Sequence, residues 1–117
     1  MRNPEFIYKI ASAETVAQAR ETGTFTGMPI DARDGYIHFS TVAQLPETLA
    51  LHFRGQSGLA LLAVPTRDLG STLRWEPSRG GQLFPHLYGP LAMSAVAHIG
   101  AIEVAADGAC ILPEWVR

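Results

Sequence analysis

Six consecutive apolar residues, 59–64, constrain the fold of this chain more than any other stretch. The run reads Leu-Ala-Leu-Leu-Ala-Val and ends at Pro65. Alternate residues of a strand face opposite sides of a sheet, so a strand that is apolar throughout must be covered on both faces. We therefore expect residues 59–64 to form a central strand with other layers packed on each side.

Two helices are expected from capping signals and apolar spacing. Ser12 is a suitable N-cap for a helix over residues 13–22, and Gly23 is the usual residue just beyond a helix end. In residues 42–53 the apolar side chains recur at intervals of three and four, which predicts a second helix with one face on a sheet. Pro46 either lies in the first turn of that helix or separates a short turn from it.

Further strands are expected mainly in the second half of the chain. Residues 6–10 have the β-branched and aromatic content of a first strand, and residues 72–76 and 95–104 are expected to form later ones. Residues 23–33 are interpreted as a loop, because they contain two glycines and a proline without a clear period. Five or six strands, mostly antiparallel and in split sheets, with two or so helices define a small α+β domain.

Composition limits the architecture and the partners. A chain of 117 residues with 47% hydrophobic and 17% charged residues fits one domain with a real core. Residues 105–117 are expected to form a tail whose Trp115 docks on the body of the domain. The formal charge of −2 provides no basic field for nucleic acid. With no signal peptide and no stretch of 18 apolar residues, we expect a cytoplasmic protein with no membrane partner. The single Cys110 excludes an internal disulfide.

Residues 34–41 have the pattern of a functional site. Asp34-Gly35 is a turn pair, and in the alternating strand after it Tyr36, His38 and Ser40 share one face. Thr41, with Gln44 three residues later, fits a capping box, so the strand would lead to a helix N-terminus that favours an anion. His38 alone fits either a hydrogen-bonded core histidine or a catalytic one.

A second polar stretch, residues 74–91, is expected to face the first. Arg74 and Glu76 would share one face of a strand, either as a structural ion pair or with Glu76 presented as an acid or base beside a glycine-rich loop. His86 and Tyr88 would share a face, either to fix the loop or to meet a ligand. The four histidines share no recognised metal motif, and a Ser40-His38-Glu76 triad is not favoured because the sharp nucleophile elbow is missing.

Four blocks of the sequence resemble a known family. They are Ile7-Tyr8-Lys9-Ile10, residues 34–41 (Asp-Gly-Tyr-Ile-His-Phe-Ser-Thr), Leu73-Arg74-Trp75-Glu76 and residues 84–91 (Phe-Pro-His-Leu-Tyr-Gly-Pro-Leu). Together they are similar to the signature blocks of the bacterial family called domain of unknown function 952. The resemblance covers a family-like core of about residues 6–104. The resemblance implies a fold like that of ADP-ribosyltransferases, with two antiparallel half-sheets and NAD in the cleft between them.

The resemblance also implies roles for particular residues. Glu76 and His38 would be catalytic, with Glu76 as the carboxylate and Glu103 as the alternative. The cofactor-binding set would be Lys9, Ser40, Thr41, Arg74, His86 and Tyr88, although many relatives carry His at the position of Lys9. Two functions stay open: a transferase or hydrolase that uses NAD or an ADP-ribose derivative as substrate, without a permanently bound cofactor, or a binding module for a nucleotide or small anion. Either would be a monomer or a homodimer.

Overall fold

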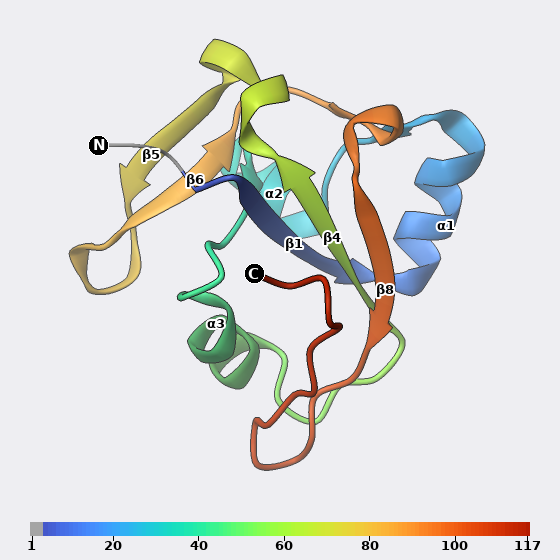
Figure 1. The fold of residues 1–117 in the computed structure, drawn as a ribbon, viewed down its shortest axis with the longest axis vertical. Coiled ribbons are helices and arrows are strands. Elements are labelled where there is room, and N and C mark those ends of the chain that lie inside the picture. Colours follow the sequence, from blue (N-terminus) through green and yellow to red (C-terminus); the bar gives the residue numbers. More distant parts are fainter. Residues whose placement is uncertain (1–3) are drawn as a thin grey trace.

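The central strand lies in a three-stranded antiparallel sheet. The computed structural model describes residues 4–117, in which β1 (Phe6–Ser12), β4 (Leu59–Pro65) and β8 (His98–Ile102) have the order β1-β4-β8 (Figure 1). All seven residues of β4 are buried. The prediction of a central strand covered on both faces is therefore confirmed.

A second three-stranded antiparallel sheet carries both of the polar stretches. Its strands are β3 (Ile37–His38), β6 (Leu83–Leu87) and β5 (Leu73–Pro77), in the order β3-β6-β5. The backbones of Tyr8 and Ser40 exchange hydrogen bonds of 2.8 and 2.9 Å, which connect β1 to the chain just after β3. A short pair, β2 (Thr24–Phe25) and β7 (Leu91–Ala92), completes the strands of the described chain.

The helices match the sequence signals in part. Helix α1 (Ala13–Thr22) has Ser12 as N-cap, whose side chain accepts from the Thr15 backbone N–H at 3.1 Å, and it ends at Gly23 with φ +88°, as predicted. Helix α3 (Leu45–His52) is shorter than expected. Residues 41–44 form a turn before it, and Pro46 lies in its first turn, where a missing N–H costs nothing.

The prediction that residues 23–33 are a loop is wrong. They contain strand β2 and most of helix α2 (Pro29–Asp34), which ends at Gly35 with φ +87°. The helix has only six residues, which is too short to show a helical period. It packs beside β3 and provides one of the most deeply buried charges in the molecule, Asp31.

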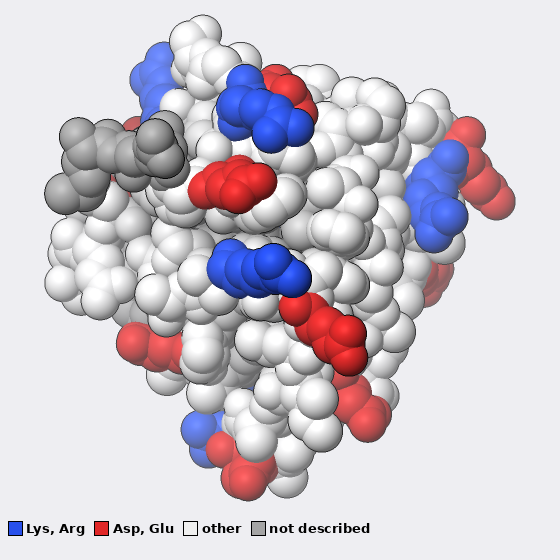
Figure 2. All heavy atoms as spheres, viewed as in Figure 1, with Lys and Arg blue, Asp and Glu red and all other residues white. Residues whose placement is uncertain are grey.

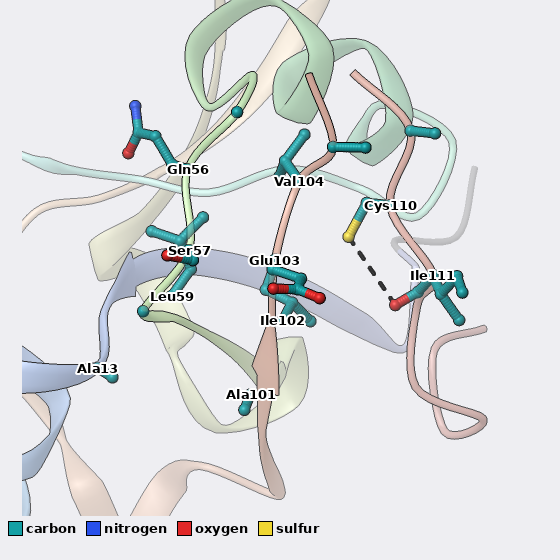
Figure 3. A pocket seen from close by; sticks show the side chains of 14 residues that line it. Ala13, Gln56, Ser57, Leu59, Ala101, Ile102, Glu103, Val104, Cys110 and Ile111 are labelled. Carbon is teal, nitrogen blue, oxygen red and sulfur yellow. Dashed lines mark hydrogen bonds between the residues drawn. The ribbon is translucent and has the colours of Figure 1, made fainter. Parts of the chain in front are cut away.

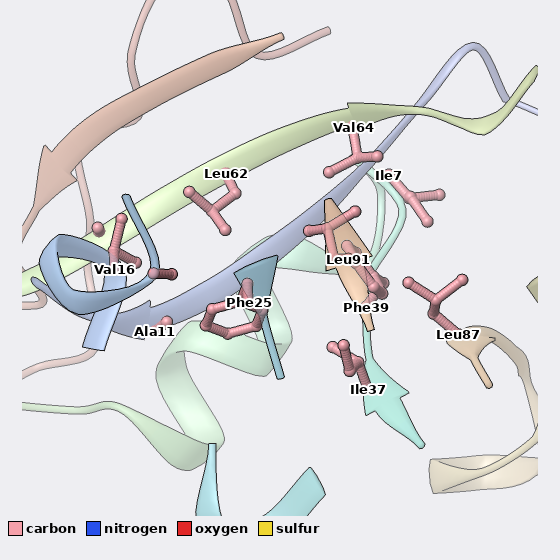
Figure 4. Packing of buried hydrophobic residues seen from close by; sticks show 12 residues of the cluster. Ile7, Ala11, Val16, Phe25, Ile37, Phe39, Leu62, Val64, Leu87 and Leu91 are labelled. Atoms are coloured by element: carbon pink, nitrogen blue, oxygen red, sulfur yellow. The ribbon is translucent and has the colours of Figure 1, made fainter. Parts of the chain in front are cut away.

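Two apolar clusters lie on opposite faces of the β1-β4-β8 sheet. On one face, Ile7, Leu62 and Val64 pack against side chains from β2, β3, β6 and β7 (Figure 4). On the other face, Tyr8, Ile10, Leu59 and Leu61 pack against α3 and the C-terminal tail. The first cluster fixes the second sheet against the first, so the polar residues of the second sheet must face outward.

Trp115 docks on the body as expected. Its indole stacks on His98 with ring centroids 5.0 Å apart and an interplanar angle of 11°. A Cβ at Gly100 would lie 2.9 Å from Trp115 Cζ2, so the tail fits here only because position 100 has no side chain. The strands and helices together define a small α+β domain with antiparallel sheets and few helices. No helix within residues 4–117 has the length and apolar character needed to span a membrane.

Candidate functional site

The polar stretches predicted to face each other are adjacent strands of one sheet. His38 pairs with His86 across β3 and β6, and His86 pairs with Arg74 across β6 and β5. Directly opposed residues project from the same face of a sheet. His38, His86, Arg74 and Glu76 therefore share one face, while Ile37 and Leu87 point into the apolar core on the other.

Asp31 is the hub of the first half of this site. Its Oδ1 lies 2.6 Å from Nδ1 of His38 and accepts the His38 backbone N–H at 3.0 Å. Its Oδ2 accepts the Met28 backbone N–H at 2.6 Å and lies 2.8 Å from Nζ of Lys9. The side chains of Asp31 and Lys9 are 1% and 5% exposed, so this is a fully buried ion pair that joins α2, β3 and β1.

Burial and charge act in opposite directions on this pair. Burial raises the pKa of Asp31, but the hydrogen bond from His38 and the charge and hydrogen bond of Lys9 lower it by more, and the pKa lies well below its usual value. Burial lowers the pKa of Lys9, although Asp31 acts to raise it. Asp31 is therefore a carboxylate, which only accepts hydrogen bonds, and Lys9 is the cation that offsets it.

His38 is engaged on both sides of its ring. Nδ1 faces Asp31, and Nε2 lies 3.0 Å from Oδ2 of Asp34, the residue that ends α2. Each ring nitrogen of His38 therefore faces a carboxylate oxygen, and neither nitrogen is free for a ligand.

Glu76 is the hub of the second half. Its Oε1 accepts the Tyr88 hydroxyl at 2.7 Å and lies 2.9 Å from Nδ1 of His86. These hydrogen bonds, first from Tyr88 and then from His86, lower the pKa of Glu76, and the bond to Glu76 raises the pKa of Tyr88. His86 is 2% exposed, whereas the Glu76 side chain is 33% exposed, so the carboxylate is open to solvent while the histidine lies beneath the surface.

Aromatic rings surround the second hub. Tyr36 stacks on His86 with centroids 4.2 Å apart, and its ring also lies 4.7 Å from His38 and 5.2 Å from Tyr88. Burial, then the charges of Asp34 and Glu76, raises the pKa of Tyr36. The Arg74 guanidinium lies over the Tyr88 ring, 4.9 Å from its centroid. The Tyr88 hydroxyl, the Tyr36 ring stacked on His86 and the exposed Arg74 cation thus surround the second hub.

A cavity of about 370 Å³ lies beside this face, between β1, the turn after β3 and helix α3. The volume is near the lower end for small-molecule sites. Its polar lining includes Lys9, His38, Ser40 and His86. Its apolar lining includes Ile10, Ile30, Phe39, Phe53 and Phe84.

The sequence-predicted residues lie in different environments. Lys9 is buried in the ion pair with Asp31, and Ser40 is 5% exposed with its hydroxyl 3.3 Å from that of Thr48. Thr41 makes the predicted capping box, in which its N–H donates to Gln44 Oε1 at 3.0 Å and its Oγ1 accepts from Gln44 N at 3.2 Å. The box caps a turn and not the helix itself, which begins at Leu45.

Glu103, the alternative carboxylate, lies outside this site. It lines an open depression of about 920 Å³ between residues 55–59 and 101–111, together with Cys110 and Ile111 (Figure 3). No histidine, arginine or lysine borders this depression among the described residues. Of the two candidate glutamates, Glu76 is the one that lies on the polar face of the sheet. Within residues 4–117, no group of three or more His, Cys, Asp or Glu is arranged to hold a metal ion.

Sequence reasoning missed Asp31 and gave Tyr36 no role. The signal for Asp31 was local: Pro29 begins α2 and Asp31, in its first turn, accepts from the Met28 N–H, which is half of a capping box. Gly27 was a second signal. Gly27 has φ +105°, and its backbone lies so close to Asp31 that a Cβ added at Gly27 would lie 2.8 Å from Cβ of Asp31.

The face of the molecule seen in Figure 2 has no single sign of charge. Acidic and basic side chains are interspersed over the face seen in Figure 2. Such a surface does not attract a polyanion over a distance. The chemistry of the molecule is therefore concentrated in the paired groups described above.

The fold and site define a small α+β domain with two carboxylate–histidine pairs on the polar face of one antiparallel sheet. The chain belongs to the family described as protein of unknown function (DUF952), whose model matches residues 10–99. The crystal structure of protein CC0527 from Caulobacter crescentus is similar, with a TM-score of 0.86, 46% identity, and 91% of this chain and 93% of that one covered. For the solution NMR structure of the same protein, the TM-score is 0.80 and the sequence identity is 47%, with 90% of each chain covered. No curated protein matches the chain.

Proposed function

We propose that this protein is a small transferase or hydrolase that acts on NAD or an ADP-ribose derivative, with Glu76 as its central carboxylate. The observation that supports the proposal is the arrangement around Glu76. One oxygen is held by Tyr88 and His86, and the side chain stays partly exposed beside two tyrosine rings. The two sheets joined through Tyr8 and Ser40 would correspond to the half-sheets of an ADP-ribosyltransferase-like fold.

A fixed carboxylate suits the chemistry of ribosyl transfer. When the bond between ribose C1′ and the nicotinamide nitrogen breaks, its electron pair leaves with nicotinamide and positive charge develops on the ribose. A preorganised carboxylate stabilises that charge without reorganisation. Because hydrogen bonds keep Glu76 ionised, it is ready for this role at neutral pH.

The neighbouring groups suit the rest of such a substrate. The faces of Tyr36 and Tyr88 can stack on a planar ring, and Arg74 can pair with a phosphate. His38, Ser40 and Lys9 would shape the wall of the adjoining cavity, and Thr41 would lie at its edge. Lys9 is neutralised by Asp31, so Arg74 replaces it as the expected phosphate contact.

One observation favours a second candidate, a binding module without turnover. Lys9 and both nitrogens of His38 are already paired with carboxylates, so this half of the site is complete without a substrate. A binding module would hold the nucleotide or small anion through Arg74 and His86 and would release no product.

The deciding experiment is a titration of the protein with NAD and with ADP-ribose, monitored by amide chemical shifts, with nicotinamide measured in the same samples. For an enzyme, shifts gather at residues 36–41 and 74–88, free nicotinamide appears, and Glu76→Gln reduces its release by about 100-fold or more. Glu103→Gln is the matched control and should have no effect. Shifts without release favour the binding module, and no shifts at millimolar ligand refute both.

A further inference from the structure

One ring nitrogen of His86, Nε2, takes no part in the hydrogen bonds of the described residues. The ring is 2% exposed, Nδ1 is 2.9 Å from Glu76, and the ring forms part of the wall of the 370 Å³ cavity. Neither Glu76 nor Tyr36, which lie at Nδ1 and on the ring face, lines that cavity. Nε2 has no hydrogen-bond partner among the residues that the structure describes.

The partner on Nδ1 determines where the ring proton lies. Hydrogen bonds from Tyr88 and His86 lower the pKa of Glu76, so it is a carboxylate and can only accept. Nδ1 of His86 must therefore carry a proton. When the ring is neutral, Nε2 has the free electron pair and is the atom that can take a proton from a ligand. His38 differs, because a carboxylate faces each of its nitrogens.

The cavity wall indicates which ligand would reach that nitrogen. Most of its surface is apolar, with contributions from Ile10, Ile30, Phe53 and Phe84. The Lys9 ammonium is neutralised within 2.8 Å by Asp31. Such a wall favours an uncharged apolar body, and the basic nitrogen favours a hydroxyl or amine hydrogen beside it.

We propose that His86 is a general base that acts through Nε2 on the hydroxyl or amine of an apolar molecule bound in this cavity, with Glu76 positioning the ring. The bond changes at the ribose rest on the proposed function, whereas the cavity and the role of His86 do not. The acceptor gives its proton to Nε2, its oxygen or nitrogen bonds to ribose C1′, and the bond from C1′ to nicotinamide breaks with the electron pair on nicotinamide. The cavity is then the acceptor site, and NAD lies on the tyrosine side of His86.

The first test is independent of any activity. Ring ¹⁵N resonances of the wild-type protein, measured between pH 5 and 9, report which nitrogens are protonated. We expect neutral His86 to keep its proton on Nδ1, and Glu76→Gln to remove that preference, because a glutamine amide can donate as well as accept. Neutral His86 with the proton on Nε2, or a ring that stays doubly protonated at pH 9, overturns the proposal.

The second test uses benzyl alcohol and benzoate as probes, titrated to millimolar concentrations with amide shifts recorded. Benzyl alcohol should shift residues 38–40 and 84–86, and benzoate should bind more weakly. His86→Asn keeps a donor near the position of Nδ1 but removes the base, so it should weaken benzyl alcohol by about 2- to 10-fold, the value of one hydrogen bond. A well-dispersed spectrum shows that this variant folds.

The outcomes separate this inference from the proposed function. No benzyl alcohol shifts, or equal affinity in His86→Asn, overturns the base and its cavity even if nicotinamide is released from NAD. Conversely, the expected tautomer and probe binding without nicotinamide release uphold the cavity and refute the NAD-directed reaction.

Discussion

Replacing Asp31 by Asn should destabilise the protein severely, because it leaves a buried cation without its counter-ion. Four donors converge on this carboxylate: Lys9 Nζ, the Met28 backbone N–H, the His38 backbone N–H and His38 Nδ1. Asn keeps one acceptor oxygen, but its NH₂ group would face donors. Breaking a buried ion pair by removing one partner costs about 3–5 kcal/mol. The total free energy of unfolding of a 117-residue domain is roughly 6–15 kcal/mol.

The loss is large enough to measure by thermal and urea denaturation at pH 7. With an unfolding entropy of about 2.1 cal/mol/K per residue, each kcal/mol shifts the Tm by about 4 °C, so we expect Asp31→Asn to lower it by about 12–20 °C. Asp34→Asn is the matched control. It also faces His38, but its side chain is 30% exposed, so its loss should stay below about 1 kcal/mol.

The pH dependence gives a second check on the same variant. The pKa of Asp31 is lowered on folding, so its stabilisation is complete above its unfolded value of 3.8 and is lost as the pH falls below that value toward the folded pKa. The gap in stability between wild type and Asp31→Asn should narrow by about 1.4 kcal/mol per pH unit below 3.8. A gap at pH 7 no larger than that of Asp34→Asn, or one that does not narrow in acid, would refute the argument that Asp31 is a buried, charged hub.

Three other variants test the fold. Ser12→Ala removes the N-cap of α1 and should cost about 1 kcal/mol in urea denaturation, with Thr24→Ala, at the exposed residue of strand β2, as control. Gly27→Ala should cost about 1–2 kcal/mol from its φ of +105° alone, and more from contact with Asp31; an unchanged midpoint would show that the backbone relaxes. Leu62→Ala, at 0% exposure in β4, should cost about 2–5 kcal/mol, and a loss under 1 would contradict its place in the core.

The parts of the fold that sequence predicts are those with dense local signals. The strand over residues 59–64 is indicated by six apolar residues in a row, and α1 by a cap at each end. The alternation in residues 36–40 predicts that Tyr36 and His38 share one face, and in the structure their rings are in contact while Ile37 and Phe39 lie in the core. These features depend on neighbours within a few positions, which the sequence shows directly.

The buried hub escaped prediction because its partners are distant along the chain. Lys9 and Asp31 are separated by 22 positions, and lysine and aspartate are both residue types that are usually exposed. The family resemblance implied a cofactor-binding role for Lys9, whereas the fold buries it against a carboxylate. Helix α2, which delivers Asp31, is too short for a period and is marked only by Pro29 and its capping box.

We expect substitution of Asp31 to reduce mainly stability and substitution of Glu76 to reduce mainly function. Asp31 is buried and ties three elements together, so its loss should weaken the fold. Glu76 is 33% exposed, and its partner His86 lies on the neighbouring strand of the same sheet, where backbone pairing already holds it. Glu76→Gln should therefore unfold much closer to wild type than Asp31→Asn does, while it loses nicotinamide release and the fixed tautomer of His86. A Glu76→Gln protein as unstable as Asp31→Asn would mean that the second pair, like the first, serves the fold.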